Sequence, residues 1–233
     1  MDKIFTKNIE HESAVKHVTG KAIYTDDISE PKNLLHAVIG YSNCSKGVIK
    51  KIDYKDVLSS EGVVDIITEK DIEGINDVGP IFKGDKIFTS KNIEYYGQPI
   101  FAVIAKTNNL AKKAALKVKI DLKISKPIVS IEEALKKKSF VLKPKHLTRG
   151  NIKDGFKKSD NILKGKLYSG GQDHFYLEGQ IAMTIPQEDN NFLVYSSTQH
   201  PSETQQIIGK VLKQNYNSIH VIVRRIGGGF GGK

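Results

Sequence analysis

The stretch that most restricts the fold of this chain is residues 218–233, Ser-Ile-His-Val-Ile-Val-Arg-Arg-Ile-Gly-Gly-Gly-Phe-Gly-Gly-Lys. Apolar residues recur at every second position from Ile219 to Val223, which predicts a strand. Five glycines then interrupt the pattern around Phe230. Because a glycine backbone can approach a ligand where a Cβ would collide, this loop is a candidate nest of N–H donors for an anionic or electron-rich group.

The same glycines fit two phosphate-binding patterns. Gly227, Gly229 and Gly232 satisfy G-x-G-x-x-G, and Gly227 with Gly232 and Lys233 satisfies the first seven positions of G-x-x-x-x-G-K. Each pattern needs a following helix whose N-terminus holds the phosphate, and the second also needs Ser or Thr after the lysine. A glycine turn without a ligand is the other interpretation, so the rest of the chain has to decide.

Length and composition indicate a globular protein. The chain has 233 residues, 39% of them hydrophobic, which is enough for one large or two ordinary domains. The longest apolar run, residues 100–105, is too short for a membrane span, and the start lacks a secretion signal, so we expect a soluble, cytoplasmic protein. Cys44 is the only cysteine, which excludes an intrachain disulfide and a cysteine-held zinc or iron–sulfur centre within these residues.

The formal net charge of +10 comes from lysines spread along the whole length, with arginine only at positions 149, 224 and 225. Proteins that read nucleic acid sequences use arginine and clustered basic faces. The charge therefore indicates a solvated lysine surface, and we expect no nucleic acid partner.

The first half of the chain reads as mixed helix and strand. Strands are predicted over residues 34–41, 49–53, 63–68, 99–105 and 118–124, and helices over 56–58, 108–116 and 131–135. The unbroken apolar run 99–105 predicts a buried strand, Thr107 can cap the helix that follows, and 118–124 alternates as a half-exposed strand. This order predicts a β-α-β unit over residues 99–124.

The second half begins after a polar stretch with Pro144 and Gly150. Segments 181–185 and 191–197 precede a helix whose start is predicted at Pro201, followed by the box-like Ser202-Glu-Thr-Gln205. The strand that leads into the glycines comes last. The order of elements predicts the α+β class.

Three groups of polar residues are candidates for a metal-binding, catalytic or ligand-binding role. Asp173, His174 and Glu178 are metal-ligand types, but no second histidine or cysteine lies at ligand spacing, so a hydrogen-bonded role is favoured. The pair of His200 and Ser202 lacks the Gly-x-Ser-x-Gly of a nucleophile elbow. Gln172 follows two glycines, where its neutral amide could be presented into a pocket or could simply close a turn.

Three longer motifs carry a family resemblance. Residues 170–179, 196–203 and 225–233 occur in an order and at spacings that resemble the molybdenum-binding subunit of xanthine dehydrogenases. Residues 19–28 and 96–104 are similar to the α/β hammerhead domain that precedes it. The resemblance extends over residues 18–233, and the form with Ser-Thr-Gln-His-Pro resembles the separate bacterial-type subunit.

The resemblance implies a domain organisation. We expect a flexible N-terminus over residues 1–13, the hammerhead domain over 14–125 and a linker over 126–150. Residues 151–233 are then the N-terminal part of a molybdopterin-binding domain. The family's substrate-contacting glutamate, catalytic glutamate and remaining pterin contacts are expected downstream of Lys233, so the chain is expected to be the first portion of a longer subunit and inactive alone.

The resemblance also implies site residues and cofactors. Gln172 matches the family glutamine that hydrogen-bonds an oxygen ligand of molybdenum. The loop that lies against the metal and its pterin dithiolene is matched by Gly228, Gly229, Phe230 and Gly231. The implied reaction hydroxylates hypoxanthine and xanthine to urate, with electrons leaving through 2Fe–2S centres and FAD on a partner subunit to NAD. The resemblance also implies a purine substrate and a hetero-oligomer that is not attached to a membrane.

Three alternatives stay open. Aldehyde oxidases share the hammerhead and the loop, so the substrate could be an aldehyde. A nucleotide-binding module would use Gly227 to Lys233 as a phosphate loop. An interaction module without catalysis would retain the hammerhead and little else.

Overall fold

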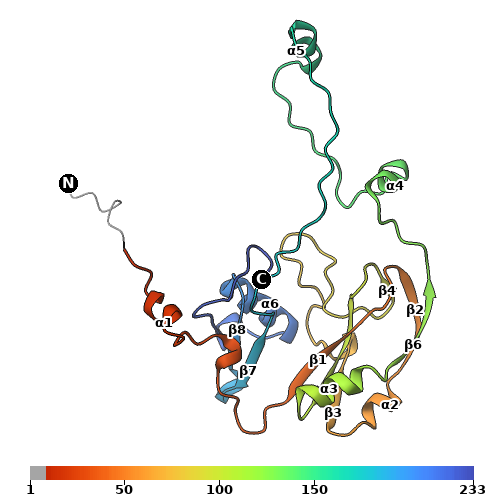
Figure 1. The fold of residues 1–233 in the computed structure, drawn as a ribbon. Helices are drawn as coiled ribbons and strands as arrows, with labels where there is room; N and C mark the ends of the chain where they lie inside the picture. Colours follow the sequence, from red (N-terminus) through yellow and green to blue (C-terminus); the bar gives the residue numbers. More distant parts are fainter. Residues whose placement is uncertain (1–8) are drawn as a thin grey trace. The chain divides into compact units, whose positions relative to one another are not determined.

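The computed structural model describes residues 9–233, so most of the predicted flexible N-terminus, 1–13, lies outside the described residues. The chain divides into two units, and Figure 1 labels their main helices and strands. One contains residues 9–124 and 174–233, and the other contains residues 125–173. The division into hammerhead domain, linker and cofactor domain stays a prediction.

The core of the first unit is built around β5. This strand is the middle of a three-stranded antiparallel sheet in the order β1 (His36–Tyr41), β5 (Pro99–Ala105), β3 (Val63–Ile67). Phe101, Val103 and Ala105 on one face have no exposed surface, and Ile100 and Ala102 on the other face are 2% and 4% exposed, as expected for a strand covered on both faces. The prediction of a buried strand at 99–105 is confirmed.

A second sheet holds the strand that follows β5 in sequence. Its order is β4 (Asn92–Ile93), β2 (Gly47–Asp53), β6 (Lys119–Ile124), and all of its pairs are antiparallel. Helix α3 (Asn108–Ala115) packs on β1 and β5, and the Thr107 hydroxyl accepts a hydrogen bond from the Leu110 N–H at 3.2 Å, which confirms the predicted cap. The predicted β-α-β unit at 99–124 is wrong because β5 and β6 lie in different sheets. Local periodicity shows that a segment is a strand but not which strand it pairs with.

Four short elements complete this part of the unit. They are α1 (Ala14–Val18), η2 (Thr25–Asp27), α2 (Lys55–Leu58) and η3 (Glu69–Asp71). Val57 of α2 is fully buried against the core, which explains why so short a helix persists.

The third sheet, in the same unit, contains the β-α-β connection. Strands β7 (Ala182–Pro186) and β8 (Phe192–Ser196) pair antiparallel across η4 (Glu188–Asn190). Helix α6 (Pro201–Leu212) and η5 (Tyr216–Ser218) then lead to β9 (Ile219–Ile222), which lies parallel to β8. The crossover therefore lies between β8 and β9, where a parallel pair requires one.

Helix α6 begins at Pro201 as predicted, but the predicted capping box is wrong. The cap is the ring of His200, whose Nδ1 accepts the Glu203 N–H at 3.1 Å. Ser202 is already the second residue of the helix, so its hydroxyl cannot serve the N-cap position.

The C-terminal end of α6 accepts hydrogen bonds from another segment of the chain. The N–H of Gly74 donates to the Val211 carbonyl at 2.9 Å, and the N–H of Ile75 donates to the Lys210 carbonyl at 3.1 Å. These carbonyls belong to the last turn, where the helix offers no partner of its own. The loop after η3 thus joins the third sheet to the first two sheets within one unit.

The second unit contains two short helices, α4 (Ile131–Lys136) and α5 (Ile152–Lys158). Each has a side-chain cap: the Ser130 hydroxyl accepts the Glu133 N–H at 3.2 Å, and the Asn151 amide oxygen accepts the Lys153 N–H at 3.0 Å. Residues 159–173 have no regular structure, and Gln172 lies in this stretch with its side chain exposed.

Candidate functional site

The glycine loop, residues 226–233, follows β9 and contacts two other segments of the first unit. Three of its residues have positive φ: 95° at Gly228, 52° at Phe230 and 91° at Gly231. Phe230 is 74% exposed, so a largely solvent-exposed side chain holds an unfavourable backbone conformation. The loop therefore presents one aromatic ring outward on a backbone that its neighbours must hold in shape.

Glu178 holds both ends of the glycine loop. Its Oε2 accepts the Gly227 N–H at 2.8 Å and the Lys233 ammonium, also at 2.8 Å. The side chains of Lys233 and Glu178 are 0% and 9% exposed, and the Lys233 ammonium lies 4.8 Å above the Tyr176 ring. The other carboxylate oxygen, Oε1, is buried and has no partner among residues 9–233.

Gln199 holds the middle of the loop. Its amide oxygen accepts the Gly231 N–H at 2.7 Å and the Lys233 N–H at 3.4 Å. On the other segment, the Tyr176 hydroxyl and the Gln180 amide both donate to the Gly232 carbonyl, at 3.2 and 3.1 Å. The structure thus brings together the 225–233 motif, the 196–203 motif and the end of the 170–179 motif.

The chain itself requires glycine at three positions of the loop. An added Cβ at Gly227 would lie 2.5 Å from the Glu178 Cβ. One at Gly229 would lie 2.7 Å from the Gln199 amide oxygen, and one at Gly232 would lie 2.8 Å from the Tyr176 ring. Close packing against these side chains accounts for the glycines before any ligand is considered.

The donor set of the loop fits an electron-rich group. In the described part of the chain, the N–H groups of Gly228, Gly229 and Phe230 donate to no protein acceptor. A cavity of about 380 Å³ is lined by residues that include Ser197, Thr198, Gly232 and Lys233 at the end of the loop. Free amides and the unpaired oxygen of Glu178 offer donors and an acceptor to a pterin, which carries both kinds of group.

The predicted site residues fall in two units. Gly228, Gly229, Phe230 and Gly231 lie together in the glycine loop, whereas Gln172 lies in the unit of residues 125–173. That Gln172 and Phe230 share one pocket wall stays a prediction. Within residues 9–233, no group of three His, Cys, Asp or Glu side chains could hold a metal ion.

The geometry opposes the phosphate-loop alternative. A phosphate loop extends its lysine toward the β- and γ-phosphates. Here the Lys233 ammonium is fully buried and donates to Glu178. Releasing it would leave a carboxylate buried without its counter-charge, which is costly.

Sequence reasoning named Glu178 and Lys233 but did not predict that these two residues, together with Gln199, hold the loop. Glu178 and Gln199 stand inside the motifs 170–179 and 196–203, so their place in the resemblance was available as a signal. Their distance from the loop along the sequence gave no signal of this contact, because Glu178 and Lys233 are 55 positions apart.

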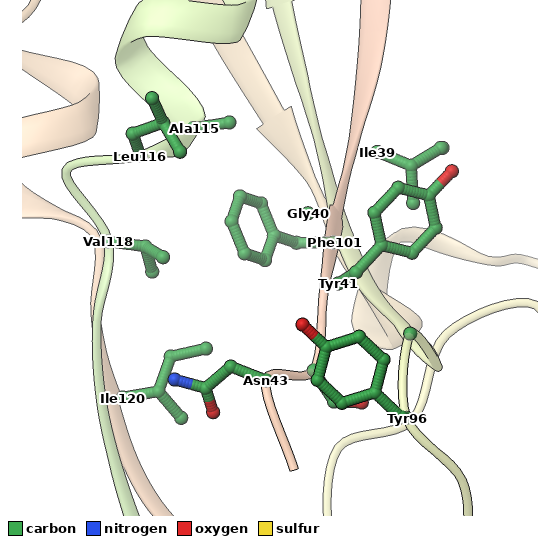
Figure 2. A pocket seen from close by; sticks show the side chains of 12 residues that line it. Ile39, Gly40, Tyr41, Asn43, Tyr96, Phe101, Ala115, Leu116, Val118 and Ile120 are labelled. Atoms are coloured by element: carbon green, nitrogen blue, oxygen red, sulfur yellow. The ribbon is translucent and has the colours of Figure 1, made fainter. Parts of the chain in front are cut away.

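A larger cavity of about 720 Å³ is lined by residues between Ile39 and Ile120 of the first unit. Figure 2 shows the Phe101 ring near Gly40, with Tyr41 and Tyr96 on one side and Leu116 on the other. Its lining includes no Asp, Glu, His, Lys or Arg side chain and none of the predicted site residues. Among the helices of residues 9–233, none has the length and the apolar character of a membrane span.

Comparisons with protein families match both halves of the chain. Residues 19–126 match the aldehyde oxidase and xanthine dehydrogenase a/b hammerhead domain. Residues 133–233 match the molybdopterin cofactor-binding domain.

Similar proteins include two kinds of enzyme. Xanthine dehydrogenase of Dictyostelium discoideum is 39% identical over 98% of this chain, and aldehyde oxidase 2 of Macaca fascicularis is 38% identical over 97%. The chain spans only 17% and 16% of the lengths of these relatives.

Two solved structures show the same fold. Aldehyde oxidoreductase from Desulfovibrio gigas matches with a TM-score of 0.82 and 25% identity over 94% of this chain and 26% of its own. Quinoline 2-oxidoreductase from Pseudomonas putida 86 matches with a TM-score of 0.81 and 20% identity over 96% of this chain and 30% of its own.

Proposed function

Because this chain belongs to the aldehyde oxidase and xanthine dehydrogenase family, we propose that it is the molybdenum-cofactor-binding part of a cytoplasmic xanthine dehydrogenase. The observation that carries the proposal is the glycine loop, where three free backbone amides and an exposed Phe230 lie together. The loop and the segments that hold it lie in the match to the molybdopterin cofactor-binding domain, residues 133–233, and residues 19–126 match the a/b hammerhead domain.

In this proposal the chain binds and orients the cofactor. The bound molybdenum group supplies the hydroxylation chemistry. The amides of Gly228, Gly229 and Phe230 donate to electron-rich atoms of the cofactor, and Phe230 and Gly231 cover it. Gln172 is proposed to donate a hydrogen bond from its amide to the cofactor. Glu178 and Gln199 hold the loop, so that these donors are fixed before a ligand arrives, which is how a preorganised site stabilises developing charge.

The substrate is proposed to be hypoxanthine or xanthine, with urate as the product. Electrons would leave through iron–sulfur centres and FAD of a partner subunit to NAD. Relatives named xanthine dehydrogenase support the purine substrate. The hetero-oligomer and the electron acceptor stay predictions from the resemblance. An aldehyde substrate is the second candidate, supported by aldehyde oxidase relatives at similar identity.

The test uses the complete enzyme that carries these residues. We expect it to contain molybdenum and to form urate from xanthine, and we expect Gln172→Ala to lower kcat at least about tenfold without lowering Tm. Gln187→Ala, an exposed turn residue, serves as the control. Carboxylate formation from aldehydes without urate would favour the second candidate. An unchanged kcat in Gln172→Ala would remove the role of Gln172, and the isolated 233 residues are expected to form no urate.

A further inference from the structure

A second cleft, of about 510 Å³, lies between residues 16–29 and the third sheet of the first unit. Its lining carries four cationic side chains from two distant parts of the chain: Lys16, Lys21, Arg224 and Arg225. Asp27 is the only carboxylate among its lining residues. Two arginines are notable here because the whole chain has only three.

The one carboxylate of the cleft is already engaged. Asp27 accepts the Tyr24 N–H at 2.9 Å and so closes the turn η2. None of the four cations forms an ion pair with a carboxylate among the described residues 9–233. The cleft therefore gathers positive charge without a counter-charge from the protein.

Arg225 makes this imbalance costly. One of its terminal nitrogens donates to the Ile23 carbonyl at 2.7 Å, and the other donates to the Ser13 hydroxyl at 3.4 Å. Its Nε is buried and donates to no acceptor in the described part of the chain. A guanidinium held in place by neutral groups and partly withdrawn from water gains most from an external anion.

The walls between the charges are apolar and aromatic. Tyr24 and Tyr195 contribute rings, and Ile28 and Ile222 contribute aliphatic surface. The volume lies in the range of small-molecule sites and exceeds what a bare inorganic ion fills. The rings and the aliphatic surface suit a flat organic body, and the cations suit a phosphate or carboxylate attached to it.

We propose that this cleft binds a small organic anion, a planar ring that bears a phosphate or carboxylate group. The anionic group binds among Lys21, Arg224 and Arg225, and the ring lies against Tyr24 and Tyr195. The proposal stands on the cleft alone and does not depend on the proposed cofactor or substrate of the glycine loop.

The test measures binding of AMP to the complete protein by calorimetry at low ionic strength, with adenosine and inorganic phosphate as partial probes. We expect saturable AMP binding that weakens as salt is added, and weaker binding of either partial probe. The double variant Lys21→Gln/Arg224→Gln is expected to lower AMP affinity about tenfold or more. Both side chains are exposed, so the fold does not depend on them.

The matched control is Lys112→Gln/Lys113→Gln, which removes the same charge from the exposed face of α3. It should leave AMP affinity unchanged. An equal loss in both double variants would show diffuse attraction to a basic protein and overturn the proposal. Absence of saturable AMP binding would leave the cleft to a macromolecular contact and overturn it too, as would inorganic phosphate that binds as tightly as AMP.

Discussion

Glu178 has two carboxylate oxygens in very different surroundings. Oε2 accepts from Gly227 and from Lys233, whereas Oε1 is buried without a partner. A single carboxylate therefore joins the first and last residues of a seven-residue span and leaves one oxygen for a ligand that donates. At this scale, the shape of the glycine loop depends on a side chain that lies outside it.

Replacing Glu178 with Gln tests that dependence. The change keeps the size of the side chain but leaves the Lys233 ammonium buried without a counter-charge, so we expect a loss of about 3–5 kcal/mol in unfolding free energy. The double variant Glu178→Gln/Lys233→Met should recover much of it. The measurement is urea denaturation.

The control for this change is Asp56→Asn. It breaks the 2.7 Å pair with Lys119, whose side chains are 49% and 70% exposed, and should cost less than about 1 kcal/mol. Equal losses in Glu178→Gln and Asp56→Asn would mean that the Glu178–Lys233 pair contributes no more than a surface pair.

At the scale of elements, β5 and α2 meet through two aromatic rings. Tyr54, at the start of α2, packs its ring edge against Phe101 of β5, with centroids 5.2 Å apart and an interplanar angle of 71°. Burial, and then the nearby charge of Asp71, raise the pKa of Tyr54 from 10.0 to about 12. The contact therefore depends on a neutral phenol.

The sign of this pKa shift predicts a pH dependence. Because the folded-state pKa is raised, the stabilisation is fully present below pH 10 and is lost as the pH rises from 10 toward 12. Unfolding free energies measured at either side of this window should fall more for the natural protein than for Tyr54→Phe. Parallel curves for the two proteins would contradict a raised pKa at Tyr54.

Elements with a strong local signal were predictable from sequence. The unbroken apolar run fixed β5 at 99–105, and Thr107 fixed the start of α3. The strand that pairs with β6 was not predictable, because the alternation of apolar and polar residues in β6 fits any sheet with one exposed face. The His200 cap was missed because an imidazole seldom fills that position and Ser202 fitted the common pattern. In the site, the loop was predictable from its glycines, while Glu178 and Gln199 reach it only through tertiary contacts.

On the scale of the whole molecule, Gly74 joins the first two sheets, β1-β5-β3 and β4-β2-β6, to the third sheet. An added Cβ there would lie on the Lys210 carbonyl oxygen, so Gly74→Ala must push the loop off the end of α6. The two hydrogen bonds to Lys210 and Val211 would be lost, at a cost of about 2 kcal/mol.

We expect Gly74→Ala to lower the cooperativity of unfolding. The natural protein should unfold residues 36–124 and 182–222 in one urea transition, and Gly74→Ala should separate or broaden it. Gly179→Ala is the control, since a Cβ at Gly179 meets nothing within 4 Å. A single sharp transition at the original midpoint in Gly74→Ala would show that the contact does not couple the sheets.

The bonds from Arg225 to Ile23 and Ser13 connect positions 202 and 212 residues apart. On a ribosome that adds about 5–20 residues per second, the segment around Ile23 waits about 10–40 seconds for its arginine to be made. During that interval the beginning of the nascent chain cannot reach its final contacts. The basic cleft can therefore form only after residue 225 has been synthesised.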